Sequence, residues 1–341
     1  MTRILKVIFS VCGFIAFVLM VRAIGLEAIA VDLRRMGLWF LAIIALWGIA
    51  YLFNTGAWYF ILNGGRKVGF GRIFQVCVSG FALNNLTPLV GMGGEPYRAM
   101  VLKERLGTGD SLSAVVLYWM LHFLSSFVFW VLVIPVVTVT LLFSVDIRMI
   151  FAVTFVFSLA GVWFMMLRHR NGMFHKLYGL TQKSAALRRL TEKFAVTENS
   201  ILLVDNRIKA LYNKRRKDFY LSLLFEVVAR ILVSLEFVFV LTAIGIHITP
   251  LEALYLSAGY YLFVDAFFFI PLQLGAREGG LYLLTGAIGI APAVGVFMAL
   301  VMRIRELFWT LVGLLLVHAG GISAKRPSIA ELIRNEEADA K

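Results

Sequence analysis

Residues Asn84–Arg98 read NNLTPLVGMGGEPYR, and residues Asp265–Gly280, in the second half of the chain, read DAFFFIPLQLGAREGG. In both stretches a Pro-Leu pair leads into a glycine-containing turn, and a glutamate follows seven residues after the proline. Pro and Gly interrupt helices. Inside lipid, an interrupted backbone is tolerated only where protein buries it or where it lines a wet cavity. Interruptions at corresponding positions of two halves therefore indicate the binding site of a transporter.

The candidate site residues are of three kinds, and the first two kinds lie in the two stretches. We predict that polar and charged side chains contact the substrate: Asn84, Asn85, Glu95, Arg98, Asp265, Arg277 and Glu278. We predict hinge or turn roles for Pro88, Gly91, Gly93, Gly94, Pro271, Gly275 and Gly279, and the last two also fit a tight helix-packing motif. Glu226 and Arg230 are four residues apart on one helix face, and we expect an ion pair that holds the bundle together.

Composition places the chain among polytopic membrane proteins. Of its 341 residues, 60% are hydrophobic, and the mean hydropathy is +0.86, far above that of a soluble domain. The net charge of +13 is interpreted as cytoplasmic loops facing anionic lipid rather than as nucleic-acid binding. Cys12 and Cys77 have no spacing typical of a disulfide framework or zinc site. We predict an all-α protein of the cytoplasmic membrane, with a homo-oligomer left open.

The hydropathy pattern predicts about seven or eight membrane helices plus two re-entrant or broken helical hairpins. The expected segments are 4–21, 36–62, 74–89, 111–143, 150–167, 219–246, 251–271, 281–302 and 307–318. They form a single membrane-embedded domain with repeat 1 at about 36–167, repeat 2 at about 219–320 and a polar tail at 321–341. We expect the repeats to have inverted topology.

Three features of these segments carry further expectations. Residues 74–89 are short for a crossing and have basic residues on both sides, so we predict a hairpin that enters and returns. Arg303 and Arg305 separate the last two segments and are expected at the cytoplasmic face. His122, His247 and His318 are isolated in the sequence, and packing roles are expected for them.

Residues 168–218 form a basic connector between the halves. Apolar residues recur in it at helical spacing, which predicts two amphipathic helices on the cytoplasmic membrane face. Two interpretations stay open for its charge: a solvated loop that follows the positive-inside rule, and recognition of lipid headgroups.

Catalytic motifs are missing from the sequence. It contains no GxxxxGK[ST], HExxH or GxSxG motif and no paired-cysteine metal motif. We therefore expect neither an enzyme nor a bound cofactor or metal.

The motif residues Asn85–Pro88 and Gly93–Ala99, together with Gly275–Gly280, resemble the flippase-like membrane domain of lysylphosphatidylglycerol synthases, the multiple peptide resistance factors. The resemblance covers roughly residues 4–320. In large family members this domain is assigned the movement of an aminoacylated phospholipid across the membrane, and a separate soluble domain transfers the amino acid. This chain shows no such soluble domain, so the resemblance implies lipid movement without aminoacyl transfer, and the lipid is not inherited from the relatives.

Together these observations predict a lipid flippase or transporter that moves a phospholipid or lipid-linked headgroup across a bacterial or archaeal cytoplasmic membrane. The two hairpins would meet near the midplane around a polar cavity. Arg98 and Arg277 would contact phosphate, while Glu95, Glu278 and Asp265 would balance those arginines, bind a cationic group or carry a proton. Two alternatives stay open: a secondary transporter of a small anionic or amphipathic solute, and a non-transporting membrane partner of a lipid-modifying enzyme.

Overall fold

A computed structural model of the chain describes residues 26–62, 68–86, 93–141, 144–168, 213–268 and 275–319, with a few single residues between 179 and 211 and between 270 and 273. The described residues form helices and their connections, so the expected all-α class is confirmed. The predicted first segment 4–21, Pro88, Gly91, Pro271, the tail 321–341 and nearly all of the 168–218 connector lie outside the described residues.

The described helices are α2 (Leu26–Met36), α3 (Leu38–Ile61), α4 (Phe70–Leu86), α5 (Gly94–Leu106), α6 (Thr108–Thr140), α7 (Val145–Arg168), α11 (Arg216–Val233), α12 (Leu235–Ala243), α13 (Pro250–Ala266), α14 (Ala276–Ala287) and α15 (Pro292–Ala319).

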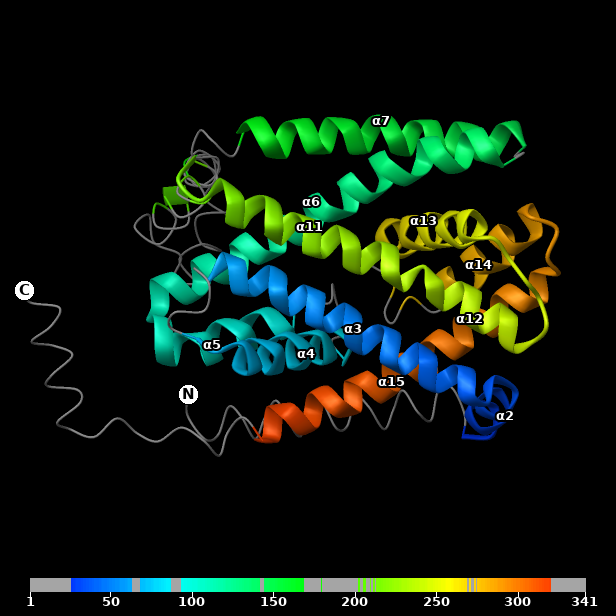
Figure 1. The fold of residues 1–341 in the computed structure, drawn as a ribbon, viewed down its shortest axis with the longest axis horizontal. Coiled ribbons are helices and arrows are strands. Elements are labelled where there is room, and N and C mark those ends of the chain that lie inside the picture. The colour runs from blue at the N-terminus through cyan, green and yellow to red at the C-terminus, as the bar shows by residue number, and fades with distance from the viewer. Residues whose placement is uncertain are drawn as a thin grey trace, which may run out of the picture.

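The central pair of the bundle is α3 and α11, which lie side by side (Figure 1). The predicted short segment 74–89 is α4, which packs against α5. Helices α13 and α14 also pack against each other. Figure 1 shows the α4–α5 pair toward one end of the long helices and the α13–α14 pair toward the other.

Each half of the chain packs one hairpin helix against a long helix of the other half. Helix α4 of the first half packs on α15 of the second, and α13 of the second half packs on α6 of the first. This pattern fits a correspondence of α3 with α11, α4 with α13, α5 with α14 and α6 with α15. It supports the inverted repeat, which stays a prediction.

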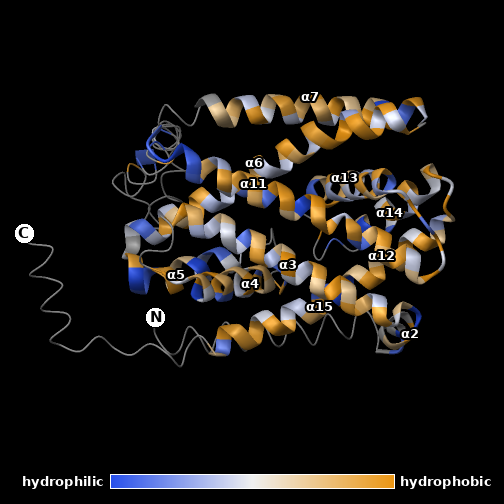
Figure 2. Ribbon diagram, in the orientation of Figure 1, coloured by the Kyte–Doolittle hydropathy of each residue, from blue (hydrophilic) through white to orange (hydrophobic). Residues whose placement is uncertain are grey.

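Three described helices are long and apolar enough to cross a membrane: Leu38–Ile61, Gly109–Thr140 and Val145–Met166. Figure 2 shows the last of these, in α7, as hydrophobic along nearly its whole length. Helix α15 is longer than 20 residues but carries Arg303, Arg305 and Glu306 near its middle. The total of seven or eight spans, and the re-entrant character of the hairpins, therefore remain predictions.

The expected boundary inside the last segments is wrong. Residues 281–302 do not form one helix, because α14 ends at Ala287 and α15 begins at Pro292 after a turn in which Gly289 has φ +76°. Arg303 and Arg305 lie within α15 and are only 4% and 3% exposed. These charges are tolerated in the interior because glutamates from neighbouring helices pair with them.

A glycine sets the close contact between α4 and α5. A Cβ at Gly94, at the start of α5, would overlap the carbonyl oxygen of Gly80 in α4. The predicted packing role of Gly275 and Gly279 is wrong, because a Cβ at either would have open space around it. Gly275 instead provides the turn into α14, with φ +81°.

Candidate functional site

The first hairpin is held together at its tip by Asn84. Its side-chain oxygen accepts from the backbone N–H of Gly94 at 2.7 Å, which caps the start of α5. Its Nδ2 donates to Oε1 of Glu95 at 3.2 Å. Gly93 precedes this helix start with φ −66°, an ordinary helical conformation. The predicted residues Asn84, Gly94 and Glu95 are therefore brought together in space.

Arg98 lies behind Glu95 and is buried, with 1% of its surface exposed. Its Nη1 donates to Oε1 of Glu95 at 2.7 Å. The guanidinium carbon lies 5.6, 4.7 and 5.5 Å from the ring centres of Trp58, Phe81 and Tyr118, an arrangement that favours a cation. Arg98 is thus placed to orient Glu95, and its contact with a phosphate remains a prediction.

Two buried atoms of this pair are left unpartnered. Among the described residues, Nε of Arg98 and Oε2 of Glu95 have no hydrogen-bond partner. Buried polar groups are usually satisfied, so these two atoms are exceptions within the first hairpin.

The predicted residues of the second hairpin are engaged by α15. Nη1 of Arg277 donates to both oxygens of Glu306 at 2.6 and 2.7 Å, and its Nε donates to Gln273 at 2.6 Å. Glu278 accepts from Nε of Arg303 at 2.6 Å, and its other oxygen accepts from the backbone N–H of Gly275 at 2.9 Å.

A third pair extends this arrangement to α12. Arg305 donates through Nε to Oε1 of Glu236 at 3.0 Å, and Trp47 donates through Nε1 to Oε2 of the same carboxylate at 2.9 Å. The guanidinium carbon of Arg305 lies 3.7 Å from the centre of the Trp47 ring. We call these three arginine–glutamate pairs the ion-pair layer: Glu236, Arg277, Glu278, Arg303, Arg305 and Glu306.

The predicted direct ion pair between Glu226 and Arg230 is not found among the described residues, because His122 lies between them in a second buried cluster. Oε2 of Glu226 lies 2.8 Å from Nδ1 of His122, and its Oε1 accepts from Asn54 at 2.9 Å. Nη2 of Arg230 lies 3.1 Å from Nε2 of His122, and its Nε donates to Ser125 at 2.9 Å. The guanidinium donates to one ring nitrogen, so the other ring nitrogen carries the hydrogen that faces Glu226. His122 therefore has a specific polar role beyond packing.

A large groove opens beside the first hairpin. This lateral groove has a volume of about 840 Å³, within the range of ~300–1,000 Å³ typical of ligand sites. The polar part of its lining consists of Asn84, Glu95, Arg98, His122, Ser126 and Asp265. Its apolar wall comes from α6 and α7: Trp119, Phe123, Phe127, Trp130, Val153 and Phe157. Residues of both hairpins thus line one groove, Asn84 and Glu95 from the first and Asp265 from the second.

Asp265 is exposed in this groove. Among the described residues it forms no ion pair within 4 Å. Glu95, by contrast, is balanced by Arg98. The polar part of the groove is therefore acidic.

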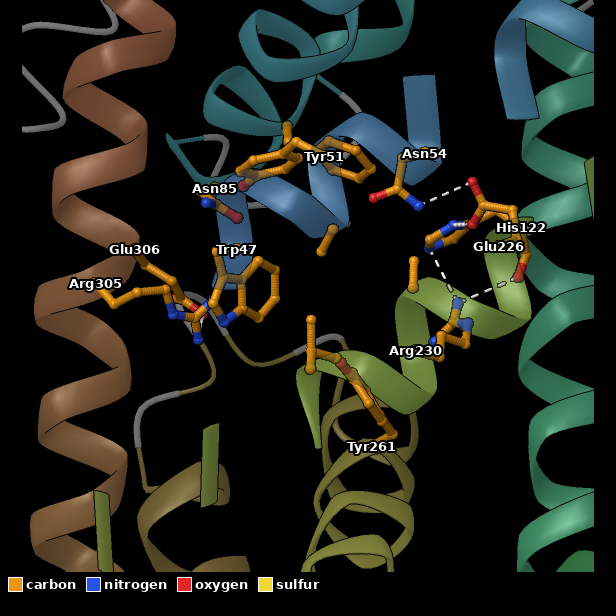
Figure 3. Close-up of a pocket in the computed structure, with 14 residues that line it drawn as sticks. Trp47, Tyr51, Asn54, Asn85, His122, Glu226, Arg230, Tyr261, Arg305 and Glu306 are labelled. Carbon is orange, nitrogen blue, oxygen red and sulfur yellow. Dashed lines mark hydrogen bonds and ion pairs between the residues drawn. The ribbon is translucent and has the colours of Figure 1, made fainter. Parts of the chain in front are cut away.

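A smaller cavity of about 190 Å³ lies at the centre of the bundle (Figure 3). We call it the central chamber, and its polar lining consists of Trp47, Tyr51, Asn54, Asn85, His122, Glu226, Arg230, Tyr261, Arg305 and Glu306. Figure 3 shows Glu226, His122 and Arg230 on one side and Arg305 and Glu306 on the other. Phe81 and His122 line both this chamber and the lateral groove, so the two cavities adjoin.

Sequence patterns did not reveal several of these residues. His122 is isolated along the chain, and its partners lie more than one hundred positions away. In the sequence alone, the neighbouring charges of Arg303, Arg305 and Glu306 resemble those of a cytoplasmic loop. The signal that could have identified them is their position in an otherwise apolar stretch, because charges inside a bundle are costly unless they are paired.

One of three comparisons with known proteins gave a match. Residues 3–313 match the family described as Lysylphosphatidylglycerol synthase TM region. Comparison with curated proteins and with solved structures gave no match. The family match covers most of the chain and confirms the resemblance carried by the two hairpin motifs. The protein is therefore a multi-pass membrane protein that belongs to the family of lysylphosphatidylglycerol synthase transmembrane regions.

Proposed function

We propose that the protein moves a phospholipid or another lipid with a polar headgroup between the leaflets of the cytoplasmic membrane, without itself acting as an enzyme. The lateral groove is the observation that carries this proposal. Its lining combines a polar part with aromatic and aliphatic side chains. A headgroup would contact the polar part while the acyl chains follow the apolar wall.

The groove is reached from the side of the bundle. Its wall residues Phe123, Val153 and Phe157 are 42%, 69% and 65% exposed. In a membrane-spanning bundle these side chains face lipid. A lipid can therefore enter the groove while its acyl chains stay in the bilayer. This lateral access favours a lipid over a small water-soluble solute.

Glu95 and Asp265 are proposed to recognise the headgroup. Both are acceptors in the polar part of the groove, and Asp265 forms no ion pair with a described cation. An amine or hydroxyl of the headgroup would supply the missing donor. Arg98 would hold the Glu95 carboxylate in position.

The test is leaflet exchange in proteoliposomes. Fluorescent phosphatidylglycerol and phosphatidylethanolamine serve as probes, together with labelled versions of lipids that copurify with the protein. Val153→Trp places a large ring in the groove. Val156→Trp makes the same change three residues further along α7, where the side chain is 65% exposed and does not line the groove.

We expect wild type and Val156→Trp to exchange at least one probe and Val153→Trp to slow that exchange at least tenfold. Glu95→Gln should also slow it. Equal rates in Val153→Trp and Val156→Trp would show that lipid does not pass through the groove. If wild type moved none of the probes, with or without a proton gradient, the proposal of lipid movement would be wrong.

A further inference from the structure

We propose that the central chamber is a subsite for a phosphate-class anion, and that Arg230 is its main donor. The proposal rests on the proposed function, in which the anion is the phosphate of the lipid headgroup. It gives Arg230 the role that the sequence suggested for Arg98 and Arg277.

The carboxylates around the chamber already accept hydrogen bonds from the protein. Each oxygen of Glu226 and of Glu236 receives a donor from a neighbouring side chain. Both oxygens of Glu306 accept from Nη1 of Arg277. These carboxylates therefore have little remaining capacity to bind a cation.

The donors, in contrast, are only partly used. Arg230 is 9% exposed, and its hydrogen bonds run through Nε to Ser125 and through Nη2 to the ring and carbonyl of His122. Among the described residues, its Nη1 makes no hydrogen bond, and neither do the hydroxyls of Tyr51 and Tyr261. All three residues line the chamber.

The excess of unused hydrogen-bond donors over unused carboxylate oxygens favours an anion. The charges of Glu226 and Glu306 cancel those of Arg230 and Arg305, so the attraction comes from unused N–H and O–H groups rather than from net charge. A guanidinium with a free nitrogen is a strong donor to phosphate oxygens. The volume of about 190 Å³ has room for a phosphate-sized group with some water, since one water takes ~30 Å³.

The position of the chamber fits a lipid phosphate. His122 and Phe81 form the boundary with the lateral groove, so a headgroup that reaches past them would enter the chamber. The rest of the polar headgroup would then lie near Asp265, whose carboxylate accepts hydrogen bonds and so favours a donor rather than an anion. The two cavities together would bind a headgroup with an anionic part and a donor-bearing part.

The experiment measures binding to the full chain in detergent by isothermal titration calorimetry. The probes are dihexanoyl phosphatidic acid, inorganic phosphate and dihexanoylglycerol, which lacks the phosphate. Arg230→Lys retains the charge but removes the fork of donors. Tyr261→Phe removes a hydroxyl that makes no hydrogen bond within the described structure, so folding should not depend on it. Tyr220→Phe, at an exposed site, is the matched control.

We expect phosphatidic acid to bind, dihexanoylglycerol to bind at least tenfold more weakly, and Arg230→Lys to lose roughly tenfold or more in affinity, as for a lost charge-assisted hydrogen bond. Tyr261→Phe should weaken binding severalfold and Tyr220→Phe should not. Inorganic phosphate that bound as tightly, with the same losses in the variants, would support the anion site and assign it to free phosphate.

Unchanged affinity in both Arg230→Lys and Tyr261→Phe, or equal binding of dihexanoylglycerol, would overturn the proposal. The outcome is separable from that of the exchange assay. Exchange that survives with no such binding refutes the subsite alone, whereas binding without exchange refutes lipid movement and leaves the subsite in place.

Discussion

Removing the charge of Glu236 should destabilise the bundle strongly. Its carboxylate is 2% exposed and accepts from Arg305, which is 3% exposed, at 3.0 Å. Breaking a buried ion pair by removing one partner typically costs ~3–5 kcal/mol, because the other charge is left buried without compensation. Arg305 retains Glu306 at 3.7 Å, beyond hydrogen-bond distance, so we expect Glu236→Gln to cost about 3 kcal/mol.

The double variant isolates the pair. Glu236→Gln with Arg305→Met removes both charges, and the glutamine can still accept from Nε1 of Trp47. Replacing both members of a buried pair is often close to neutral, so the double variant should lie within about 1 kcal/mol of wild type, giving a coupling energy of about 3 kcal/mol. Glu27→Gln, the same change at an exposed site in the first turn of α2, is the control.

Stability would be measured as the free energy of unfolding in mixed micelles, with dodecyl sulfate as denaturant and tryptophan fluorescence as the signal. The reasoning is refuted if Glu236→Gln costs less than about 1 kcal/mol, the range of an exposed pair. It is also refuted if the double variant loses as much as the two single variants together, since the residues would then act independently.

Two further changes can be followed by the same unfolding assay. Gly94→Ala should cost ~1–3 kcal/mol, because its methyl group would overlap the carbonyl oxygen of Gly80 and a backbone cannot move aside easily. Gly279→Ala, in open space on α14, should be neutral or slightly stabilising. Similar losses of stability in both variants would contradict this account. Thr249→Ala should cost about 1 kcal/mol, because the Thr249 hydroxyl accepts from the backbone N–H of Glu252 at the start of α13; an unchanged free energy would show that this cap does not contribute.

Much of the fold follows from local patterns in the sequence. The expected segments 36–62, 74–89, 111–143, 150–167 and 251–271 correspond to α3, α4, α6, α7 and α13 within a few residues. Long apolar runs and Pro/Gly interruptions are local properties, so they can be recognised without knowing what the segments pack against. The segment 219–246 was expected as one helix but is divided between α11 and α12 at Ser234.

The predicted site residues are separated by the tertiary structure into two groups. Glu95 and Asp265 line the lateral groove, whereas Arg277 and Glu278 are committed to ion pairs with α15. The sequence presents the two hairpins as equivalent because their motifs are alike. Whether a hairpin keeps free polar groups depends on the helix that faces it. Helix α15 supplies charged partners for Arg277 and Glu278, whereas α6 supplies His122 and serines.

By itself, the sequence determined that this is an α-helical membrane protein with two stretches interrupted by Pro and Gly, because hydrophobicity and backbone-breaking residues act locally. Only the tertiary structure decided that His122 joins Glu226 to Arg230 and that Arg305 is buried against Glu236. These partners are 104, 108 and 69 positions apart in the chain. The physical reason is that a buried charge is tolerated only with a partner, and the partner is chosen by how the helices pack rather than by neighbouring residues.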